Sequence, residues 1–474
     1  MLKQLQPTAL ILISMIGLAG CAQLSAEQAF LDVSDDVLER TGRKILWNSG
    51  SPEDLQAEDV MKSVLSRQLT AKNTIQIALL NNKELQASYT KLGVAQADLV
   101  QAGLLSNPIL DGAITFPEGI STPNLTFGLA VKFIEILWIP LKRDIATSEL
   151  ETVKLEISGL VIDMVARTHT AYIDYIAARQ QVELLQQVVR SSRATIEAAS
   201  ALRKAGNITA LQFDQQKNIL TLAKLNLAKA ETNAVGMKEE LNVLMGLSGK
   251  DINWRAPNRL PTLPRYDVKT ANIEKTAIEN SLDLAQIKQS LFTLATKYQL
   301  KRKQSLLPDL EVGAEYERDD GEKQFGPTFE IEIPIFDMGE AKRAKAKLEI
   351  EKLRSQYWSL GIQIRSTARL LRAKILTTRK TVAFYRQTVL PENKQIVSGV
   401  QRDYNAMQAG VFQLITAKRQ QISSGQQYIA AQQDYWRARI AIKQLIHGRL
   451  PGNNGGAELN STISAANNAE GGGH

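Results

Sequence analysis

The sequence is poor in the residues from which redox and metal sites are built. Its 474 residues include one cysteine, Cys21, and three histidines, His169, His447 and His474, which lie far apart along the chain. A single cysteine excludes an intramolecular disulfide, and no cluster of His and Cys has the spacing of metal ligands. No nucleophile or acid–base constellation stands out either. The sequence therefore predicts no metal site, no cofactor and no catalytic residue, and it favours a protein that is not an enzyme.

Long apolar runs are scarce as well. The run from Thr8 to Leu18 is shorter than the roughly 20 residues of a membrane-spanning helix. The rest of the chain has no run long enough for such a helix, so crossing a membrane would require a closed β-barrel. The 57 Lys and Arg exceed the 49 Asp and Glu only modestly. No nucleic-acid-binding motif accompanies this excess, so nucleic acid is not an expected partner.

The first residues resemble a bacterial lipoprotein signal. The apolar run ends in Leu18-Ala19-Gly20-Cys21, which is similar to a lipoprotein cleavage box. The resemblance implies that residues 1–20 are removed and that Cys21 is acylated. Ala22 follows in place of an aspartate, which favours the outer membrane. The alternative is a signal cut elsewhere, with Cys21 discarded or free.

Two halves of the chain follow the same plan, with matching landmarks about 200 residues apart. The matched positions are Pro108 and Pro308, Pro140 and Pro334, Ala205-Gly206 and Ala409-Gly410, and Gly246 and Gly448. The first repeat covers residues 71–257 and the second covers 258–449. Residues 21–70 are predicted to form a partly extended, lipid-anchored tether, with a short helix near 53–67. Residues 450–474 are rich in Gly, Asn and Ser and are predicted to be disordered.

Each repeat contains a short pair of strands with period-2 alternation. The first pair is predicted at about 109–116 and 125–136, and the second at about 309–318 and 327–335, with a loop at 319–327. One face of these strands is apolar. The opposite face carries Asp111, Lys132, Glu311, Glu315, Glu317, Glu330 and Glu332. A soluble sheet or a membrane barrel could show this alternation, and two matched hairpins in an exported lipoprotein favour the barrel.

Very long helices flank the strands. A helix is predicted over 71–104, and helical hairpins are predicted over 141–247 and 340–447, because these long segments contain few Gly and Pro residues. Pro391 predicts a kink in the second hairpin. Helices of this length need other helices to cover them, so we expect coiled-coil packing. The fold class is therefore mainly α with a β-barrel, built from two structural repeats with four membrane strands per chain.

Four strands are too few to close a barrel in a membrane, because the smallest barrels have about eight. Several copies of the chain must then share one barrel, so we expect a homo-oligomer.

With this layout the chain resembles the TolC-type outer-membrane efflux family from about residue 71 to 449. The segment Pro334-Ile335-Phe336-Asp337-Met338-Gly339 is similar to the family's strand-to-helix junction, while Pro140 begins a first junction that departs from that form. The resemblance implies a homotrimer with a 12-stranded barrel and a long periplasmic helical tunnel. It also implies that the protein is a passive outer-membrane export channel.

The same resemblance implies partners and a place for them. A periplasmic adaptor (a membrane fusion protein) would dock at the tunnel tip and connect the channel to an inner-membrane transporter. The tip corresponds to the turns at Ala205-Gly206 and Ala409-Gly410, where glycine tolerates positive φ. Some family members close the tip with paired aspartates. Residues 411–416 contain no acid, which leaves Asp214, Phe412 and Gln413 as candidate gate residues.

Two charge patterns give hypotheses about the passage. The glutamates on the polar strand face predict a preference for cations. Residues 340–386 hold 13 Lys and Arg and three Glu, which could line the lumen, face the adaptor or form a solvated helix surface.

Two other functions remain open at this stage. The chain could be the outer channel of a type I protein-secretion system, or a soluble periplasmic coiled-coil scaffold lipoprotein.

Overall fold

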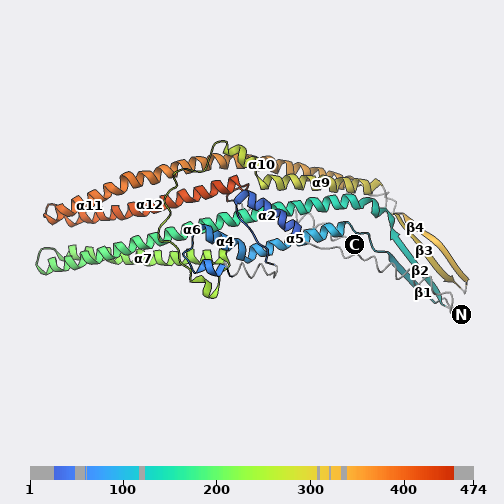
Figure 1. The fold of residues 1–474 in the computed structure, drawn as a ribbon, viewed down its shortest axis with the longest axis horizontal. Helices are drawn as coiled ribbons and strands as arrows, with labels where there is room; N and C mark the ends of the chain where they lie inside the picture. Colours follow the sequence, from blue (N-terminus) through green and yellow to red (C-terminus); the bar gives the residue numbers. More distant parts are fainter. Residues whose placement is uncertain are drawn as a thin grey trace. The chain divides into compact units, whose positions relative to one another are not determined.

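The computed structural model describes residues 26–48, 59, 61–116, 123–306, 310–319, 322–331 and 339–452. The signal segment, Cys21 and the tail from residue 453 lie outside the described residues. The described chain is mainly helical with one small antiparallel sheet, which confirms the coarse fold class (Figure 1). It divides into two compact units. The first contains Met1–Asp32, Tyr89–Lys154 and Ile287–Gln356, and the second contains Val33–Ser88, Leu155–Gln286 and Tyr357–His474.

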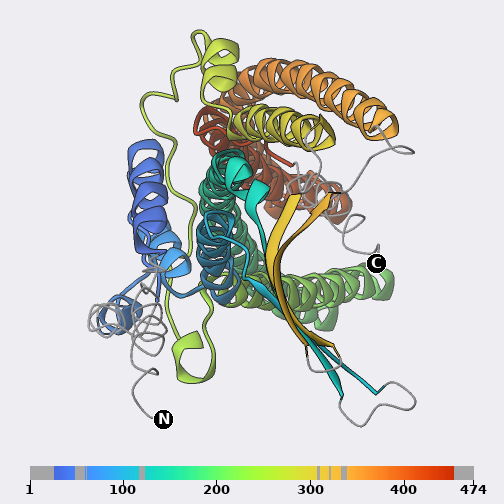
Figure 2. The same cartoon turned by 90° about the vertical axis from the view of Figure 1, so that its right-hand side faces the viewer.

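The sheet belongs to the first unit and follows chain order. Its strands are β1 (Ile109–Thr115), β2 (Asn124–Lys132), β3 (Leu310–Asp319) and β4 (Glu322–Ile331). All neighbours pair antiparallel in the order β1-β2-β3-β4, and Figure 2 shows the four strands running together as one twisted ribbon. Because the second hairpin continues the first through β2 and β3, the sheet is open, with β1 and β4 at its edges.

Two strand boundaries differ from the prediction. The second strand was expected to reach residue 136, but β2 ends at Lys132 and a 3-10 helix, η1 (Phe133–Trp138), follows it and ends at the buried Trp138. The fourth strand begins at Glu322, before the predicted 327, so part of the predicted loop is strand. Pro327 is accommodated inside β4 because an edge strand does not need every backbone N–H for the ladder.

The first long hairpin comprises α6 (Ile139–Lys204) and α7 (Ala210–Met245). At 1.5 Å per residue, α6 has a length of about 99 Å. The side chain of Thr209 accepts a hydrogen bond from Gln212 N–H and begins α7, and Gly246 ends it with φ +65°.

The second long hairpin is interrupted once. It comprises α10 (Glu340–Phe384), a π-helical segment η3 (Tyr385–Val389), α11 (Leu390–Asn405) and α12 (Val411–Ile446). The interruption lies directly before Pro391, where the ring and the missing N–H disturb regular α-helical bonding. Asn393 Nδ2 donates to the Val389 carbonyl oxygen at 2.8 Å and so satisfies an acceptor at this point.

The predicted helix over 71–104 is broken. The structure has α4 (Ala71–Asn81) and α5 (Lys83–Ala102), separated at Asn82. Asn82 Oδ1 accepts a hydrogen bond from Leu85 N–H, and its Nδ2 donates to the Leu244 carbonyl oxygen. These side-chain bonds give the backbone an alternative to continuous helix. In the second half, α8 (Ile273–Glu279) and α9 (Leu282–Leu306) are similarly separated by Asn280 and Ser281.

The predicted tether also differs from the structure. Residues 27–41 form a helix, α2 (Glu27–Thr41), rather than an extended segment. Ala29, Val33 and Val37 recur every four residues and are 3%, 1% and 0% exposed. This narrow apolar stripe, within a polar sequence, packs the helix onto the body of the chain. Residues 61–65 are helical, within the short helix predicted near 53–67.

A buried ion-paired cluster in the second unit holds the segment that follows α12. Arg449 NH2 lies 2.6 Å from Asp163 Oδ2 on α6, and its NH1 pairs with Asp283 at the start of α9. The backbone N–H of Leu450 donates to the second Asp283 oxygen at 3.2 Å. Each buried charge therefore has an opposite charge and hydrogen bonds, as burial requires.

Membrane-spanning helices are not found in this part of the chain. Of the helices that the structure describes, none combines the length and the apolar character needed to cross a bilayer.

Candidate functional site

The first candidate site is the polar face of the sheet. Lys132, Glu311 and Glu330 are cross-strand partners, so they point to the same side. The Lys132 Nζ lies 3.2 Å from Glu311 Oε1. Asp111 and Glu315 are both partners of Gly128 and share this face, as does Glu317 by strand alternation. Six of the seven charged residues predicted on one face therefore share it, and Glu332 lies outside the described residues.

Small residues keep this polar face open. A Cβ added at Gly128 would collide with the carboxylate of Asp111, which lies across the glycine. Gly313 is similarly crowded, with Thr328 Oγ1 2.7 Å from the position of such a Cβ. Glycine at these positions gives the neighbouring polar side chains room to lie flat on the sheet.

The opposite face of the sheet is apolar and uncovered. Its exposed side chains include Leu110, Ile114, Phe127, Leu129, Val131, Val312, Phe325, Phe329 and Ile331. Phe325 and Phe329 are 79% and 77% exposed. An exposed apolar face of this size is typical of a surface that contacts another protein or a membrane.

The strand-to-helix junctions are only partly described. Pro140 is the second residue of α6, within the first turn where the absence of an N–H is harmless. Gly339 has φ +75° and directly precedes α10. The junction residues Pro334, Phe336 and Asp337 lie outside the described residues.

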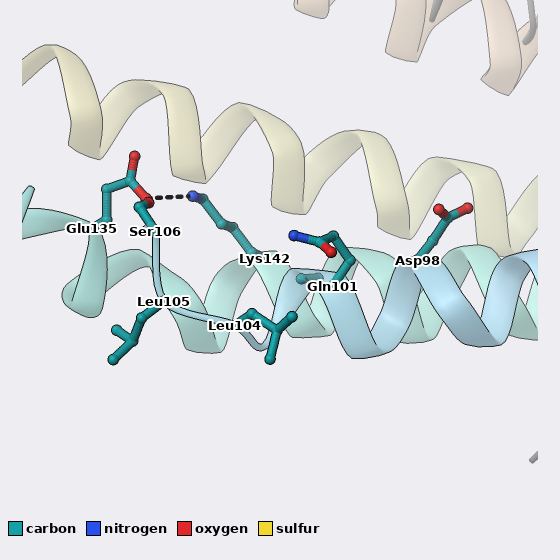
Figure 3. A pocket seen from close by; sticks show the side chains of 8 residues that line it. Asp98, Gln101, Leu104, Leu105, Ser106, Glu135 and Lys142 are labelled. Carbon is teal, nitrogen blue, oxygen red and sulfur yellow. Dashed lines mark hydrogen bonds and ion pairs between the residues drawn. The ribbon is translucent and has the colours of Figure 1, made fainter. Parts of the chain in front are cut away.

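A pocket of about 380 Å³ lies at the first junction (Figure 3). Ser106 Oγ donates to the Glu135 carboxylate, and Lys142 Nζ lies 3.5 Å from Glu135 Oε2. Figure 3 shows Leu104 and Leu105 pointing away from the side on which Lys142 and Glu135 meet. The ion pair therefore ties η1 to the first turns of α6. The sequence did not reveal this contact, because the three residues come from separate elements.

The second candidate site is formed by the two helical turns, each described within its own hairpin. Gly206 has φ +76° and Ala205 precedes it, as predicted for a tight reversal. The second turn is different, because Gly410 has φ −79° and the left-handed residue is Met407, with φ +59°. The assignment of positive φ to Gly410 was therefore wrong.

The prediction paired Gly206 with Gly410, but in the structure the residue that corresponds to Gly410 is Thr209, three residues later. Gly410 is the N-cap of α12, as Thr209 is of α7, and the third helical residue is glutamine in both cases. Gln212 Oε1 accepts from Thr209 N–H at 2.8 Å, and Gln413 Oε1 accepts from Gly410 N–H at 3.2 Å. Met407 therefore corresponds to Gly206. Sequence reasoning missed it because methionine is not a residue expected in this conformation.

The candidate gate residues lie close to these turns. Asp214 and Phe412 are exposed, Phe412 by 60%. Gln413 is occupied by the cap of α12, which is a structural role. Met407, 89% exposed, places a further apolar side chain at the second turn.

Metal-binding and catalytic clusters were not predicted. Within the described ranges, no three His, Cys, Asp or Glu side chains are grouped as metal ligands would be. His169 is on α6, and burial together with the charges of Lys443, Arg43 and Arg439 lowers its pKa to about 4. It is therefore neutral at pH 7.

The chain is similar in sequence to two curated proteins and in structure to outer-membrane channels. No protein-family model matches the chain. The cobalt-zinc-cadmium resistance protein CzcC of Cupriavidus metallidurans is 20% identical over 396 residues, which cover 80% of this chain and 90% of CzcC. The pyoverdine export outer membrane protein OpmQ of Pseudomonas putida is 22% identical over 224 residues, 44% of each protein. The Campylobacter jejuni CmeC outer membrane channel has a similar structure, with a TM-score of 0.66, 14% identity and coverage of 83% of this chain and 89% of CmeC.

The chain is similar in sequence and in fold to outer-membrane efflux proteins of the TolC type. OpmQ is described as an export outer membrane protein and CmeC as an outer membrane channel.

Proposed function

We propose that the protein is the outer-membrane channel of a tripartite efflux system. It is a passive conduit, and an inner-membrane transporter supplies the energy. The observation that carries this proposal is the sheet with one acidic face and one exposed apolar face. The relatives CzcC, OpmQ and CmeC, whose names refer to metal resistance, export and an outer membrane channel, support it.

The apolar face of the sheet contacts outer-membrane lipid in this proposal. Aromatic and aliphatic side chains on one face and acids on the other follow the apolar-out, polar-in pattern of membrane strands. A soluble periplasmic scaffold would leave Phe325 and Phe329 in water, and each would lose about 1.5–3 kcal/mol of burial free energy.

The sheet edges support a homotrimer. β1 and β4 each present one unpaired edge, and unpaired backbone groups are costly in lipid. Joining β4 of one copy to β1 of the next removes these edges, and three copies give a 12-stranded barrel. The face that carries Asp111, Glu311 and Glu315 then lines the lumen.

The chain has an internal duplication in this proposal, with repeats 71–257 and 258–449. Two equivalent contacts support it. Asn81 Nδ2 donates to the Met245 carbonyl oxygen at 2.9 Å, and Asn280 Nδ2 donates to the Ile446 carbonyl oxygen at 2.9 Å. The glycine beyond each acceptor, Gly246 and Gly448 respectively, packs against the backbone of the same asparagine.

The helical turns dock a periplasmic adaptor. The exposed residues Leu211, Met407 and Phe412 give both hairpins apolar side chains at their turns. These side chains suit a protein partner, because apolar anchors dominate the energetics of interfaces. The lipid anchor on Cys21 would hold the periplasmic part of the chain near the membrane.

Ion selectivity in planar bilayers tests the proposal. The purified protein should form conducting pores that prefer cations, because the lumen face carries more acids than bases. Replacing Glu311, Glu315 and Glu317 by Gln should reduce this preference. Replacing Glu197 on α6 and Glu231 and Glu240 on α7 by Gln is a matched control and should leave the preference closer to that of the parent protein. A protein that forms no pores would contradict the channel itself.

A further inference from the structure

Two helices of the second unit carry exposed apolar residues opposite their buried faces. On α10, Ile375 and Val382 are 0% and 3% exposed, whereas Leu376 and Phe384 are 47% and 58% exposed. On α7, Leu241 is fully buried. A helix that buries one face in its own chain and keeps a second apolar face exposed has an unfilled contact surface.

The exposed residues form two short rows of matching length. On α10 the row is Leu376, Lys380 and Phe384. On α7 the row is Val235, Glu239 and Val243, in which the two valines are 60% and 74% exposed. Residues at i, i+4 and i+8 lie along one helix face, so each row presents a charge between two apolar side chains.

The two rows are complementary in charge. Lys380 and Glu239 are exposed, and neither forms an ion pair with any described residue of its own chain. Placed against each other, the rows bring a base opposite an acid and apolar side chains together on both sides.

The two rows also lie at the same height along the helices. Arg379 NH1 lies 2.9 Å from Asp267 Oδ1, and Asp267 accepts a hydrogen bond from Tyr435 Oη. Two residues further along α12, Arg437 NH2 lies 2.7 Å from Asp174 Oδ2 on α6. Residue 379 of α10 is therefore level with residue 174 of α6.

Contacts through one tryptophan show that a part of α7 lies at the same height as Asp174 of α6. The ring of Tyr175, next to Asp174, lies 5.2 Å from the ring of Trp254. Trp254 Nε1 donates to Asn242 Oδ1 at 2.8 Å, and Lys238 Nζ lies 5.2 Å from its ring. Lys380 and Glu239 are thus at one height.

The helix directions match as well. α7 returns antiparallel to α6 after a short turn. On α12, Gln444 contacts Asp163 of α6 and Gln433 contacts Asp174, so α12 is also antiparallel to α6. Because α10 and α11 precede the turn to α12, α10 is antiparallel to α7. In this orientation Leu376 meets Val243 and Phe384 meets Val235.

We propose that the α10 row of one copy packs against the α7 row of the next copy and closes a ring of identical chains. A rotation axis parallel to the helices keeps every residue at its own height, so rows at one height meet. The contact is heterologous, with different surfaces on the two partners. This inference rests on the proposed multi-copy channel and specifies which helix faces join its copies outside the barrel.

Disulfide cross-linking tests the contact. The full chain has one native cysteine, Cys21, and the unaltered chain serves as a control for cross-linking through it. Mild oxidation of membranes that contain the double variant Leu376→Cys with Val243→Cys should produce a ladder of covalent oligomers that ends at the ring size. Each single variant should remain monomeric under denaturing conditions, because a heterologous contact never places residue 376 beside its own copy.

A register control sharpens the test. Leu376→Cys with Val235→Cys displaces one cysteine by eight residues, about 12 Å along the helix, and should not cross-link. Covalent dimers from Leu376→Cys alone, or equal ladders from both double variants, would overturn the contact. Light scattering and bilayer conductance separate the two proposals. A conducting oligomer without the ladder refutes this interface only, whereas a non-conducting monomer refutes the channel as well.

A charge exchange supplies an independent readout. Lys380→Glu should weaken association of the detergent-solubilised oligomer by about 2–5-fold per contact, and so should Glu239→Lys. The double exchange should recover the association of the parent protein. If the loss of association in the double variant equals the combined losses of the two single variants, the two side chains do not meet.

Discussion

At the scale of single residues, the second half of the chain shows how one backbone atom can require glycine. Gly448 has φ +105°, and a Cβ there would collide with the carbonyl oxygen of Asn280. Gly42 also has positive φ, +65°, but a Cβ there would meet no atom within 4 Å. A Cβ at either position would cause backbone strain, but only at Gly448 would it also collide with another atom. Comparing the two positions therefore separates the effect of strain from that of the collision.

Gly448→Ala should lower the free energy of unfolding more than Gly42→Ala does. Left-handed strain alone costs about 1–2 kcal/mol for a residue with a Cβ, and Gly448→Ala adds the collision with Asn280. Thermal unfolding of the two variants in the same detergent measures the difference. Equal melting temperatures would show that the contact with Asn280 relaxes without cost.

His169 should make the protein less stable in acid. An unfolded histidine binds a proton below pH 6.5, whereas burial and three nearby cations lower the pKa of His169 in the folded chain to about 4. Between these values the unfolded state binds more protons, so stability falls as the pH falls. The loss amounts to as much as about 3 kcal/mol.

Denaturant unfolding at pH 7 and pH 4 measures this dependence. His169→Gln should reduce the slope between those values without abolishing it, because burial also lowers the pKa of His447. An unchanged slope in the variant would show that His169 does not titrate as its surroundings indicate.

At the scale of elements, the π-helical segment and Pro391 belong together. Leu390 N–H donates to the carbonyl oxygen of Tyr385, five residues earlier, so this turn holds an extra residue. The extra residue lets the chain pass Pro391, whose ring would otherwise meet the carbonyl of residue 387.

Deletion of Gln387 should therefore destabilise the helix, and Pro391→Ala should restore much of the loss. The deletion regularises the turn but forces Pro391 into an α-helical position, at a cost of about 3 kcal/mol. Deletion of Ala373 is the control. It rotates Ile375 and Val382 by about 100° off the buried face, and Pro391→Ala should not rescue it. Rescue of both deletions would contradict the pairing of π turn and proline.

The sequence was informative where one physical signal acts over many residues. The alternation from Leu310 to Tyr316 predicted which side chains share a face of the sheet, because the period of two is imposed by backbone geometry. Helix ends were harder to predict. Asn82 breaks one helix through a bond to Leu244, which is distant in sequence. In α2 the three buried apolar positions form a stripe too narrow to stand out in its polar sequence. Met407 adopts a conformation that its residue type does not predict.

At the scale of the whole molecule, the account depends on where the two faces of the sheet lie. In the single chain the apolar face is exposed, and the acids of the polar face are partly to fully exposed. The proposed function assigns water to the first and lipid to the second. A single chain in water would leave the apolar face exposed and both sheet edges unpaired, and association through β1 and β4 in a membrane satisfies both faces and both edges.

Site-directed labelling along β4 in reconstituted bilayers tests this assignment most directly. Fluorescent labels attached to cysteine variants at Phe325 and Phe329 should be quenched by lipid-soluble reagents. Water-soluble reagents should not reach these two positions. Variants at Gln324 and Thr328, on the opposite face, should show the reverse. This two-residue alternation is the result that the account predicts. Equal reactivity of all four positions toward water-soluble reagents would contradict it, because the sheet would then lie in water rather than in a membrane.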